Sequence, residues 1–437
     1  MLRTKLVAWL VLTACRSPSQ SVAWQAPVEI ANGGGTKGPW QQNESDFDYV
    51  DDGTVALADD GSAAVVWVDH RDKDVHFQRF AADGARSPAV NISRTPAVFS
   101  WLPRILVAGA DVFVVWQEII FSGGSHGGDI LFARSRDGGQ TFAAPINLSQ
   151  SIGGDGKGRI DAKTWHNGSL DLARAPNGTL YVAWTEYDGP LWLTTSRDAG
   201  ETFAAPAQIA GTAARPARAP SIAAADTRVF IAWTHGEDRA ADIHVAALRV
   251  DGVEPRANVA PHLDAPIVVA RTPTYADAPK LALAGDTLHL AYAETSGGPF
   301  DPARIMYTRM QLSRAAPVSA TRLPHTFEPP RPIGDGSFPS LDVSGNRVTL
   351  LWEAGATAER ARGLALSLSR DGGRSFAEPA QVDGSRDPDG GLNGSHQGRL
   401  MKKLDTHGDA IAIVGSALTH GRGSRVWLIR GHLQTQR

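Results

Sequence analysis

One eight-residue string occurs three times in this chain with only small changes. Its copies are Ser135-Arg-Asp-Gly-Gly-Gln-Thr-Phe142, Ser196-Arg-Asp-Ala-Gly-Glu-Thr-Phe203 and Ser369-Arg-Asp-Gly-Gly-Arg-Ser-Phe376. A tight turn between strands needs a short carboxylate that accepts backbone N–H groups, glycines that adopt positive φ, and an aromatic side chain behind the turn. The string therefore predicts a turn, and it gives a structural role to its aspartates, Asp137, Asp198 and Asp371.

The string resembles the Asp-box, or BNR repeat, of the sialidase-like β-propellers. This resemblance implies an all-β fold of radially arranged blades. In that family the Asp-boxes lie on the face opposite the active site, which again separates the three aspartates from ligand binding. A fold shared by many activities does not give the function, which has to be argued from a site.

A second pattern surrounds the string. A strand that ends in an aromatic residue, often followed by an acid, recurs as Val65-Val-Trp-Val-Asp69, Val114-Val-Trp-Gln-Glu118, Val182-Ala-Trp-Thr-Glu186, Ile231-Ala-Trp-Thr-His235, Leu290-Ala-Tyr-Ala-Glu294 and Leu350-Leu-Trp-Glu-Ala354. Another apolar strand precedes it, and a segment such as Phe142-Ala-Ala-Pro-Ile-Asn-Leu148 follows each box. Because proline cannot donate to a ladder, that segment belongs at a sheet edge. Four antiparallel strands per repeat are typical of a propeller blade.

The two ends of the chain complete one repeat between them. Residues 24–31 follow the fourth-strand pattern with no repeat before them, and the chain ends after three strands of the last repeat, at 400–404, 409–416 and 425–429. We expect 24–31 to close the ring by completing the C-terminal blade, which removes an open edge. The sequence thus predicts a seven-bladed β-propeller that forms one domain over 24–437.

The first residues indicate export. Met1-Leu-Arg-Thr-Lys5 is basic, and the apolar stretch Leu6–Leu12 is too short to span a bilayer. Leu12-Thr-Ala-Cys15 resembles a bacterial lipobox, which implies a signal peptide over 1–14, a diacylated Cys15 and a tether over 15–23; the alternative is a stray thiol in a discarded leader. Arg16, where an Asp would favour the inner membrane, favours the outer membrane by resemblance to sorted lipoproteins. Cys15 is the only cysteine, so no internal disulfide forms.

The charge of the chain argues against one class of partner. It has 43 basic and 46 acidic residues and a net charge of −3. Nucleic-acid binding proteins usually carry a strong basic footprint. We therefore expect no nucleic-acid partner.

Candidate site residues lie where the first strand of each repeat begins and where the second strand ends, since these loops gather around the channel mouth. The resemblance to sialidases implies three arginines that hold a carboxylate, a Tyr–Glu nucleophile pair and an Asp acid/base. The available catalytic candidates are Arg104, Arg218, Arg399, Tyr187, Glu186, Tyr275 and Glu294. The Phe-Arg-Ile-Pro signature of the family is absent, the nearest string being Leu102-Pro-Arg-Ile105. Sialidases of the family also have six blades.

A binding function is the leading hypothesis for the same face, and an exo-glycosidase of sialidase type is the alternative. Exposed polar residues beside glycines have no role in packing, so the string Trp165-His-Asn-Gly-Ser169 and its partial echo Asn393-Gly-Ser-His396 are candidate ligand sites. The alternative is a turn that uses Asn and Gly for its geometry alone. The ligand-binding candidates are His166, Asn167, Asn393, His396, Asp51, Glu118 and Lys280. We expect a glycan, peptide or metal-bearing ligand. The mixture of His and carboxylates leaves a divalent metal open, although no metal-binding spacing occurs.

Overall fold

The computed structural model describes residues 22–39, 41, 44–95, 98–122, 125–150, 160–161, 164–165, 169–186, 189–225, 228–236, 241–249, 262–270, 274–297, 301–312, 326–355, 361–389 and 401–434. Every regular element within these ranges is a β-strand. Cys15 and the predicted signal peptide lie outside them.

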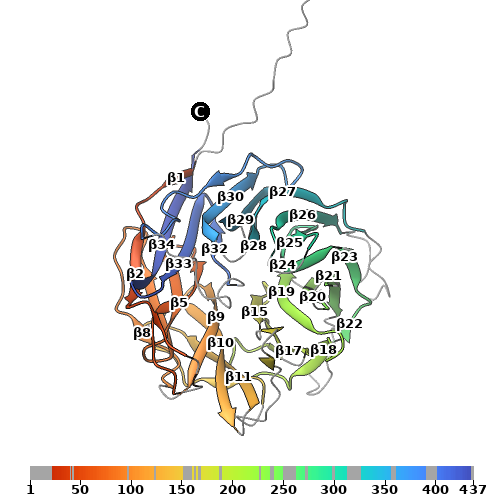
Figure 1. Cartoon of the computed structure of the whole chain (residues 1–437). Helices are drawn as coiled ribbons and strands as arrows, with labels where there is room; N and C mark the ends of the chain where they lie inside the picture. Colours follow the sequence, from red (N-terminus) through yellow and green to blue (C-terminus); the bar gives the residue numbers. More distant parts are fainter. Residues whose placement is uncertain are drawn as a thin grey trace, which may run out of the picture.

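Seven antiparallel sheets form a ring around a central opening (Figure 1), which confirms the predicted seven-bladed β-propeller. Blade 1 contains β5 (Val50–Leu57), β6 (Ala63–Asp69), β7 (Asp74–Phe80) and β8 (Val90–Asn91). Blade 2 contains β9 (Phe99–Ala108), β10 (Asp111–Ser122), β11 (Ser125–Ser135) and β12 (Ile146–Asn147). Blade 3 contains β15 (Leu170–Arg174), β16 (Leu180–Thr185), β17 (Leu191–Ser196) and β18 (Ala207–Ala210).

The remaining blades follow in chain order. Blade 4 contains β19 (Ala217–Ala225), β20 (Arg228–His235), β21 (Asp242–Arg249), β22 (His262–Leu263) and β23 (Ile267–Ala270). Blade 5 contains β24 (Tyr275–Ala284), β25 (Thr287–Thr295), β26 (Arg304–Gln311) and β27 (Arg331–Asp335). Blade 6 contains β28 (Ser337–Ser344), β29 (Arg347–Gly355), β30 (Ala361–Ser369) and β31 (Ala380–Gln381). Blade 7 contains β32 (Leu404–His407), β33 (Ala410–Thr419) and β34 (Gly423–Leu433). Two short strand pairs lie outside the blades: β3 (Thr36–Lys37) pairs with β4 (Phe47–Asp48), and β13 (Ile160–Asp161) pairs with β14 (Thr164–Trp165).

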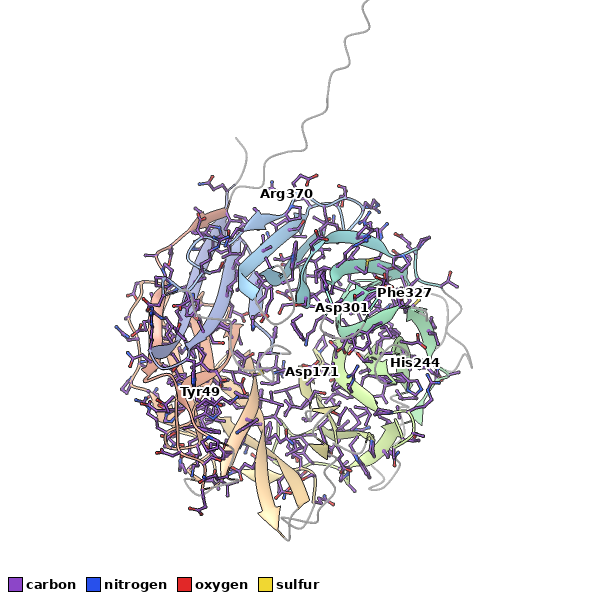
Figure 2. All side chains as sticks on the ribbon, in the orientation of Figure 1. Tyr49, Asp171, His244, Asp301, Phe327 and Arg370 are labelled. Atoms are coloured by element: carbon purple, nitrogen blue, oxygen red, sulfur yellow. The ribbon has the colours of Figure 1, made fainter. Side chains whose placement is uncertain are left out.

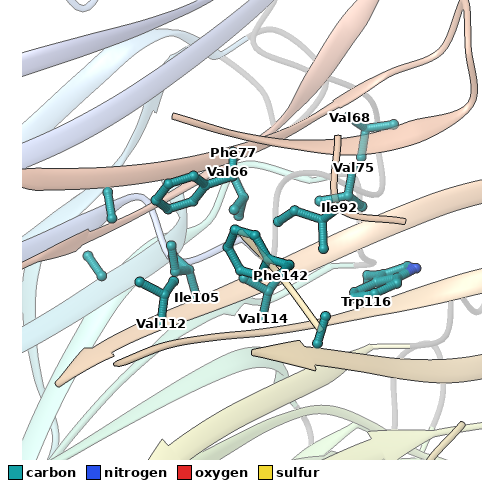
Figure 3. Close-up of a cluster of buried hydrophobic side chains, with 13 residues drawn as sticks. Val66, Val68, Val75, Phe77, Ile92, Ile105, Val112, Val114, Trp116 and Phe142 are labelled. Atoms are coloured by element: carbon teal, nitrogen blue, oxygen red, sulfur yellow. The ribbon is translucent and has the colours of Figure 1, made fainter. Parts of the chain in front are cut away.

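The core lies between neighbouring blades. Between blades 1 and 2, for example, Phe77 of β7 packs in one cluster with Val114 and Trp116 of β10 (Figure 3). Strands such as β6 are buried on both faces because each blade is covered by a blade on either side. This explains why the aromatic strands are almost continuously apolar rather than alternating.

The N-terminal segment lies against the last strand of blade 7. β2 (Val28–Gly33) and β1 (Val22–Trp24) both pair antiparallel with β34. The sequence predicts one strand over 24–31, whereas the structure has two strands with a break at residues 25–27. Pro27 lies in that break and has no N–H to donate, which explains the interruption.

The three Ser-Arg-Asp strings form turns after the third strands of blades 2, 3 and 6; we refer to residues 135–142, 196–203 and 369–376 as the Ser-Arg-Asp turns. In the first turn, Asp137 accepts hydrogen bonds from the Ser135 hydroxyl (2.7 Å), the Thr141 N–H (2.9 Å) and the Thr141 hydroxyl (2.6 Å). The Gly138 N–H donates to the Ala110 carbonyl, in the hairpin between β9 and β10. The turn therefore lies on the face of the ring opposite to the face where β9 begins. We call the face where the first strands of the blades begin the strand-start face.

The first strand of most blades lines the central opening and carries a bulge. Register shifts interrupt β5, β9, β19, β24 and β28, and one residue in each has a φ between 48° and 56°: Asp52, Leu102, Ala219, Ala278 and Phe338. Proline follows the last four of these residues. A bulge twists a strand and redirects its side chains, so the repeated bulges determine what faces the channel mouth.

Side-chain oxygens link neighbouring blades at five of the seven junctions, 1–2, 3–4, 4–5, 6–7 and 7–1, in the described part of the chain. In each link, a backbone N–H group that has no partner on a neighbouring strand donates to a side-chain oxygen. The pairs are Leu102 to Asp52, Ala219 to Ser169, Ile222 to Asp171, Leu281 to Ser221, Thr406 to Asp342 and Leu57 to Asp405. Buried N–H groups need such partners, and the inner edge of each blade has no neighbouring strand to supply them.

Candidate functional site

A cavity opens on the strand-start face between blades 5 and 6. It is a shallow, partly open cavity, and its empty space of about 330 Å³ includes the solvent at its mouth. Its lining comes from the first strands of both blades, the end of β25 and the segment before β26: Tyr275, Asp277, Ala278, Ala293, Glu294, Thr295, Ala303, Ser337 and Phe338.

A hydrogen-bonded frame holds one wall of this cavity. The Tyr275 hydroxyl donates to Asp277 Oδ2 (2.9 Å), and Arg218 Nη2 of blade 4 donates to the Tyr275 oxygen (2.8 Å). Arg218 also lies 3.7 Å from Asp277 Oδ2, and the Thr234 hydroxyl donates to Asp277 Oδ1 (2.7 Å). The frame therefore joins blades 4 and 5, and it fixes the positions of the polar atoms that face the cavity.

The charges of the frame follow from its contacts. Burial raises the pKa of the Tyr275 hydroxyl, and the Asp277 carboxylate raises it further, so Tyr275 keeps its proton. Burial opposes ionisation of Asp277 as well, but the Arg218 charge and the hydrogen bonds from Thr234 and Ala278 lower its pKa. The frame thus contains a neutral phenol between an ionised Asp and a guanidinium.

Glu294 lies at the end of β25 on the other side of the cavity. The Thr274 hydroxyl donates to its Oε1 (3.0 Å), and its side chain is half-buried. The cross-strand neighbour of Glu294 on β24 is Ala276, one residue from Asp277. Two carboxylates from neighbouring strands therefore line one cavity.

Phe338, like Tyr275, supplies an aromatic side chain to the lining. It is the bulge residue of β28, with φ of 52°, a conformation rarely adopted by bulky residues and one associated with ligand sites. The segment before it runs close to Trp352, because a Cβ on Gly336 would overlap the indole ring and the Glu353 carbonyl. The Trp352 indole N–H also donates to the Asp335 carbonyl (3.0 Å). These contacts position Phe338 at the cavity.

Arg104 and Lys280 lie on the first strands of blades 2 and 5, at equivalent positions two residues after the bulge residue. Arg104 is buried, with Nε 3.9 Å from Asp171, which Figure 2 shows beside the central opening. Burial lowers the pKa of Lys280 to about 8, with contributions from the Arg104 and Lys402 charges. These side chains therefore belong to a charged network of the channel wall.

The ligand-binding candidates of blades 1 and 2, Asp51 and Glu118, make hydrogen bonds with other side chains of the protein. Asp51 is buried with His70, whose Nε2 lies 2.8 Å from Asp51 Oδ1 and whose ring stacks on Tyr49 at 4.0 Å. Glu118 accepts hydrogen bonds from the Thr95 hydroxyl (2.8 Å) and the Trp116 indole N–H (3.2 Å). Burial raises the pKa of Glu118 despite these bonds.

The structure thus brings two sequence candidates, Tyr275 and Glu294, to one cavity, and a third, Arg218, contacts Tyr275 and Asp277 from blade 4 without lining the cavity itself. Glu186 lies in blade 3, where its N–H donates to the Pro190 carbonyl. Arg399, Tyr187, His166, Asn167, Asn393 and His396 lie outside the described residues.

Asp277 and Phe338 complete the cavity; both lie on the predicted site face, where the first strands begin, but neither is among the catalytic or ligand-binding candidates. Asp277 stands in a Tyr-x-Asp string that recurs at Tyr49 and Asp51, and Phe338 precedes one of the repeated prolines of the first strands. These repeats are the sequence signal for both residues, but the contact between Asp277 and Arg218 joins two blades and has no local signature.

Two kinds of feature are absent from the described residues. No group of three or more His, Cys, Asp or Glu side chains in that part of the chain is placed to hold a metal ion. A membrane-crossing helix, long and apolar enough, is likewise not found among the described residues.

Comparisons with known proteins show the fold. No protein-family model matches the chain, and no curated protein matches it in sequence. The structure is similar to that of the polysaccharide lyase Uly1, with a TM-score of 0.54 at 9% identity over 94% of this chain and 99% of the lyase. A protein of unknown function from Dyadobacter fermentans has a TM-score of 0.50 at 13% identity, covering 78% of this chain and 97% of that one.

A weaker similarity, with a TM-score of 0.46, is to an α-L-arabinanase of Penicillium chrysogenum complexed with arabinobiose; it has 13% identity and covers 75% of this chain and 92% of the arabinanase. Identities of this size concern the fold and not the activity. The resemblance to sialidases stays a prediction. The chain is a β-propeller whose fold resembles that of a glycan-processing enzyme.

Proposed function

We propose that this protein binds a glycan in the cavity between blades 5 and 6. The observation that carries the proposal is the convergence of Glu294, Phe338 and the Arg218–Tyr275–Asp277 frame on one open cavity. Sites of this kind combine an apolar surface with a few fixed polar groups. Fixed carboxylates accept hydrogen bonds from sugar hydroxyls, and an aromatic ring offers a flat apolar face to a sugar ring.

The chemistry of Tyr275 favours binding over a sialidase-type reaction. A nucleophilic tyrosine is activated by an adjacent base or by a lowered pKa, and its oxygen has to reach the substrate. Tyr275 has a neighbouring carboxylate in Asp277, but its side chain is buried and its oxygen also accepts a hydrogen bond from Arg218. We therefore expect the wild-type protein to leave a fluorogenic sialoside uncleaved, and turnover above background would contradict this.

A test of binding uses Phe338. The change Phe338→Ala removes the aromatic face, and we expect it to weaken glycan affinity by about tenfold without altering the melting temperature. Ile146→Ala is the control, because Ile146 is an exposed residue of β12. Glycan-array screening followed by calorimetry measures the effect, and equal affinities of the two variants would contradict the assignment of the cavity.

A second candidate function is glycoside hydrolysis, which the presence of Asp277 and Glu294 in one cavity favours. Glycosidases commonly use two carboxyl groups, one as acid and one as nucleophile or base. Asp277, whose pKa is lowered, would stay ionised, and Glu294 would be the acid. Glu294→Gln should then reduce turnover of a chromogenic glycoside at least about a hundredfold; a wild-type protein that binds glycans without cleaving them would exclude hydrolysis.

We also propose that acyl chains on Cys15 hold the propeller at a membrane, with the outer membrane preferred. The support is the Leu12-Thr-Ala-Cys15 string after a short basic and apolar leader. Cys15→Ser should abolish labelling by radioactive palmitate and release the protein into the soluble fraction. Equal labelling of the variant and the parent would contradict the anchor.

A further inference from the structure

We infer that the cavity between blades 5 and 6 selects sugars by charge, with amino sugars bound more tightly than neutral sugars and acidic sugars bound least. The inference rests on the proposed glycan binding and names the class of ligand. Its basis is the unequal way in which the two cavity carboxylates are satisfied.

Both carboxylate oxygens of Asp277 already accept hydrogen bonds from the protein. Its Oδ1 accepts from the Thr234 hydroxyl (2.7 Å) and the Ala278 N–H (2.8 Å), and its Oδ2 accepts from the Tyr275 hydroxyl (2.9 Å). The Arg218 guanidinium, 3.7 Å away, offsets its charge. Asp277 therefore shapes the wall and adds little net charge to the cavity.

Glu294 differs from Asp277 both in its hydrogen bonds and in the compensation of its charge. Among the described residues, its donor is the neutral hydroxyl of Thr274, which satisfies Oε1 but does not compensate the charge. Arg304, its cross-strand neighbour on β26, is exposed and forms no ion pair with it in the described part of the chain. Glu294 is half-buried in the cavity lining, so its carboxylate is shielded less by water than a surface charge.

The lining itself contains no cation among its described residues. A sugar carboxylate in this cavity would face Glu294 without a compensating charge, and like charges at close range are unfavourable. A sugar ammonium would instead form a charge-assisted hydrogen bond with Glu294, which is stronger than the neutral bond that a hydroxyl makes. This order of preference is the reverse of the order expected for a site that clamps carboxylates with arginines.

The test uses glycans that differ in charge but share a backbone. Wild-type protein is screened on oligosaccharides of glucosamine, glucose and glucuronic acid, and on the matching galactosamine, galactose and galacturonic acid series. Calorimetry then gives the affinity of each series that binds. We expect the amino sugar to bind about tenfold more tightly than its neutral counterpart, and this ratio to shrink at high salt.

Variants of Glu294 separate the charge from the rest of the cavity. Glu294→Gln keeps the shape and should remove the preference for the amino sugar, while Glu294→Lys should favour the acidic sugar. Glu378→Gln, at an exposed position preceding β31, is the matched control and should behave as wild type.

The possible outcomes have different meanings. Acidic sugars binding as tightly as amino sugars, or an unchanged order of preference in Glu294→Gln, would overturn the inference and leave glycan binding intact. Failure of the wild-type protein to bind any series would instead contradict the proposed function.

Discussion

At the scale of single residues, the glycines of the Ser-Arg-Asp turns carry both a conformational and a packing requirement. Gly139 has a φ of +93°, and a Cβ there would overlap the ring of Phe77 on the preceding blade. Gly373 of the third turn meets Tyr307 of the preceding blade in the same way. Each turn is therefore also a contact between blades, which the sequence string alone does not reveal.

We predict that Gly139→Ala destabilises the protein more than Gly84→Ala does. Gly84 has a similar φ of +96° but nothing within 4 Å of a Cβ, so it controls for the cost of the backbone conformation. That shared cost is about 1–2 kcal/mol, and the clash with Phe77 should add about 1–3 kcal/mol for Gly139→Ala. Urea unfolding of both variants measures the difference, and equal losses would show that the blade contact is unimportant.

The aspartates of the turns should make stability depend on acid pH. Burial alone would raise the pKa of Asp198, but hydrogen bonds from the Thr202 hydroxyl and N–H outweigh it and lower the pKa from the ordinary 3.8 to about 2. Because the folded pKa is below the unfolded one, the stabilisation is complete above about pH 4 and disappears as the pH falls toward 2.

We predict that Asp198→Asn lowers the urea midpoint at pH 6 and flattens its decline between pH 4 and 2. Asp59→Asn, at an 87% exposed side chain, should leave the profile as in wild type. Urea midpoints at several pH values test this. An Asp198→Asn profile parallel to wild type would contradict the assigned pKa.

At the scale of elements, the first strands of blades 1, 2, 4, 5 and 7 accept support from side chains of the preceding blade. Asp405 of β32 accepts the Leu57 N–H (2.7 Å) at the end of β5, across the junction of blades 7 and 1. Sequence periodicity predicts the strands themselves, since their apolar runs and turn residues are local. It does not predict these links, because they join residues that are distant in sequence.

We predict that Asp405→Ala lowers the unfolding free energy by about 1–3 kcal/mol, because it leaves the Leu57 N–H without a partner. Asp409→Ala removes a 69% exposed carboxylate that pairs with Arg347 on the surface, so it should change stability by less than about 0.5 kcal/mol. Thermal and urea unfolding of both variants provide the comparison. Equal effects would mean that the inter-blade bond contributes nothing beyond a surface charge.

At the scale of the whole molecule, the pairing of β1 and β2 with β34 joins the two ends of the chain. Without residues 22–33, β34 would have a free edge, and Trp24 and Val22 would no longer pack beside Gly431. Rings closed in this way lack the exposed strand edge that destabilises an open one.

We predict that a chain beginning at Gly34 is several kcal/mol less stable than one beginning at Val22. A synthetic peptide of residues 22–33 should restore part of the melting temperature by adding its strand back to β34. Differential scanning calorimetry with and without the peptide measures both effects. A truncated chain that melts like the parent would show that the pairing does not stabilise the ring.

The sequence predicts this architecture well because a propeller repeats one local pattern. The aromatic strands, the Ser-Arg-Asp strings and the incomplete last repeat together predict seven blades, whereas the break at Pro27 shifts the bounds of the closing strand. The candidate site is less predictable. Tyr275, Glu294 and Arg218 are polar residues of the expected face, but only their spatial positions separate them from Arg104 and Asp51, which are buried in structural contacts.

A crystal structure of the protein with a glycan that it binds tests the account most directly. We predict electron density for a sugar ring between Phe338 and Glu294, with the Arg218–Tyr275–Asp277 frame unchanged. A sugar bound instead on the face of the Ser-Arg-Asp turns, or away from the cavity between blades 5 and 6, would contradict the account.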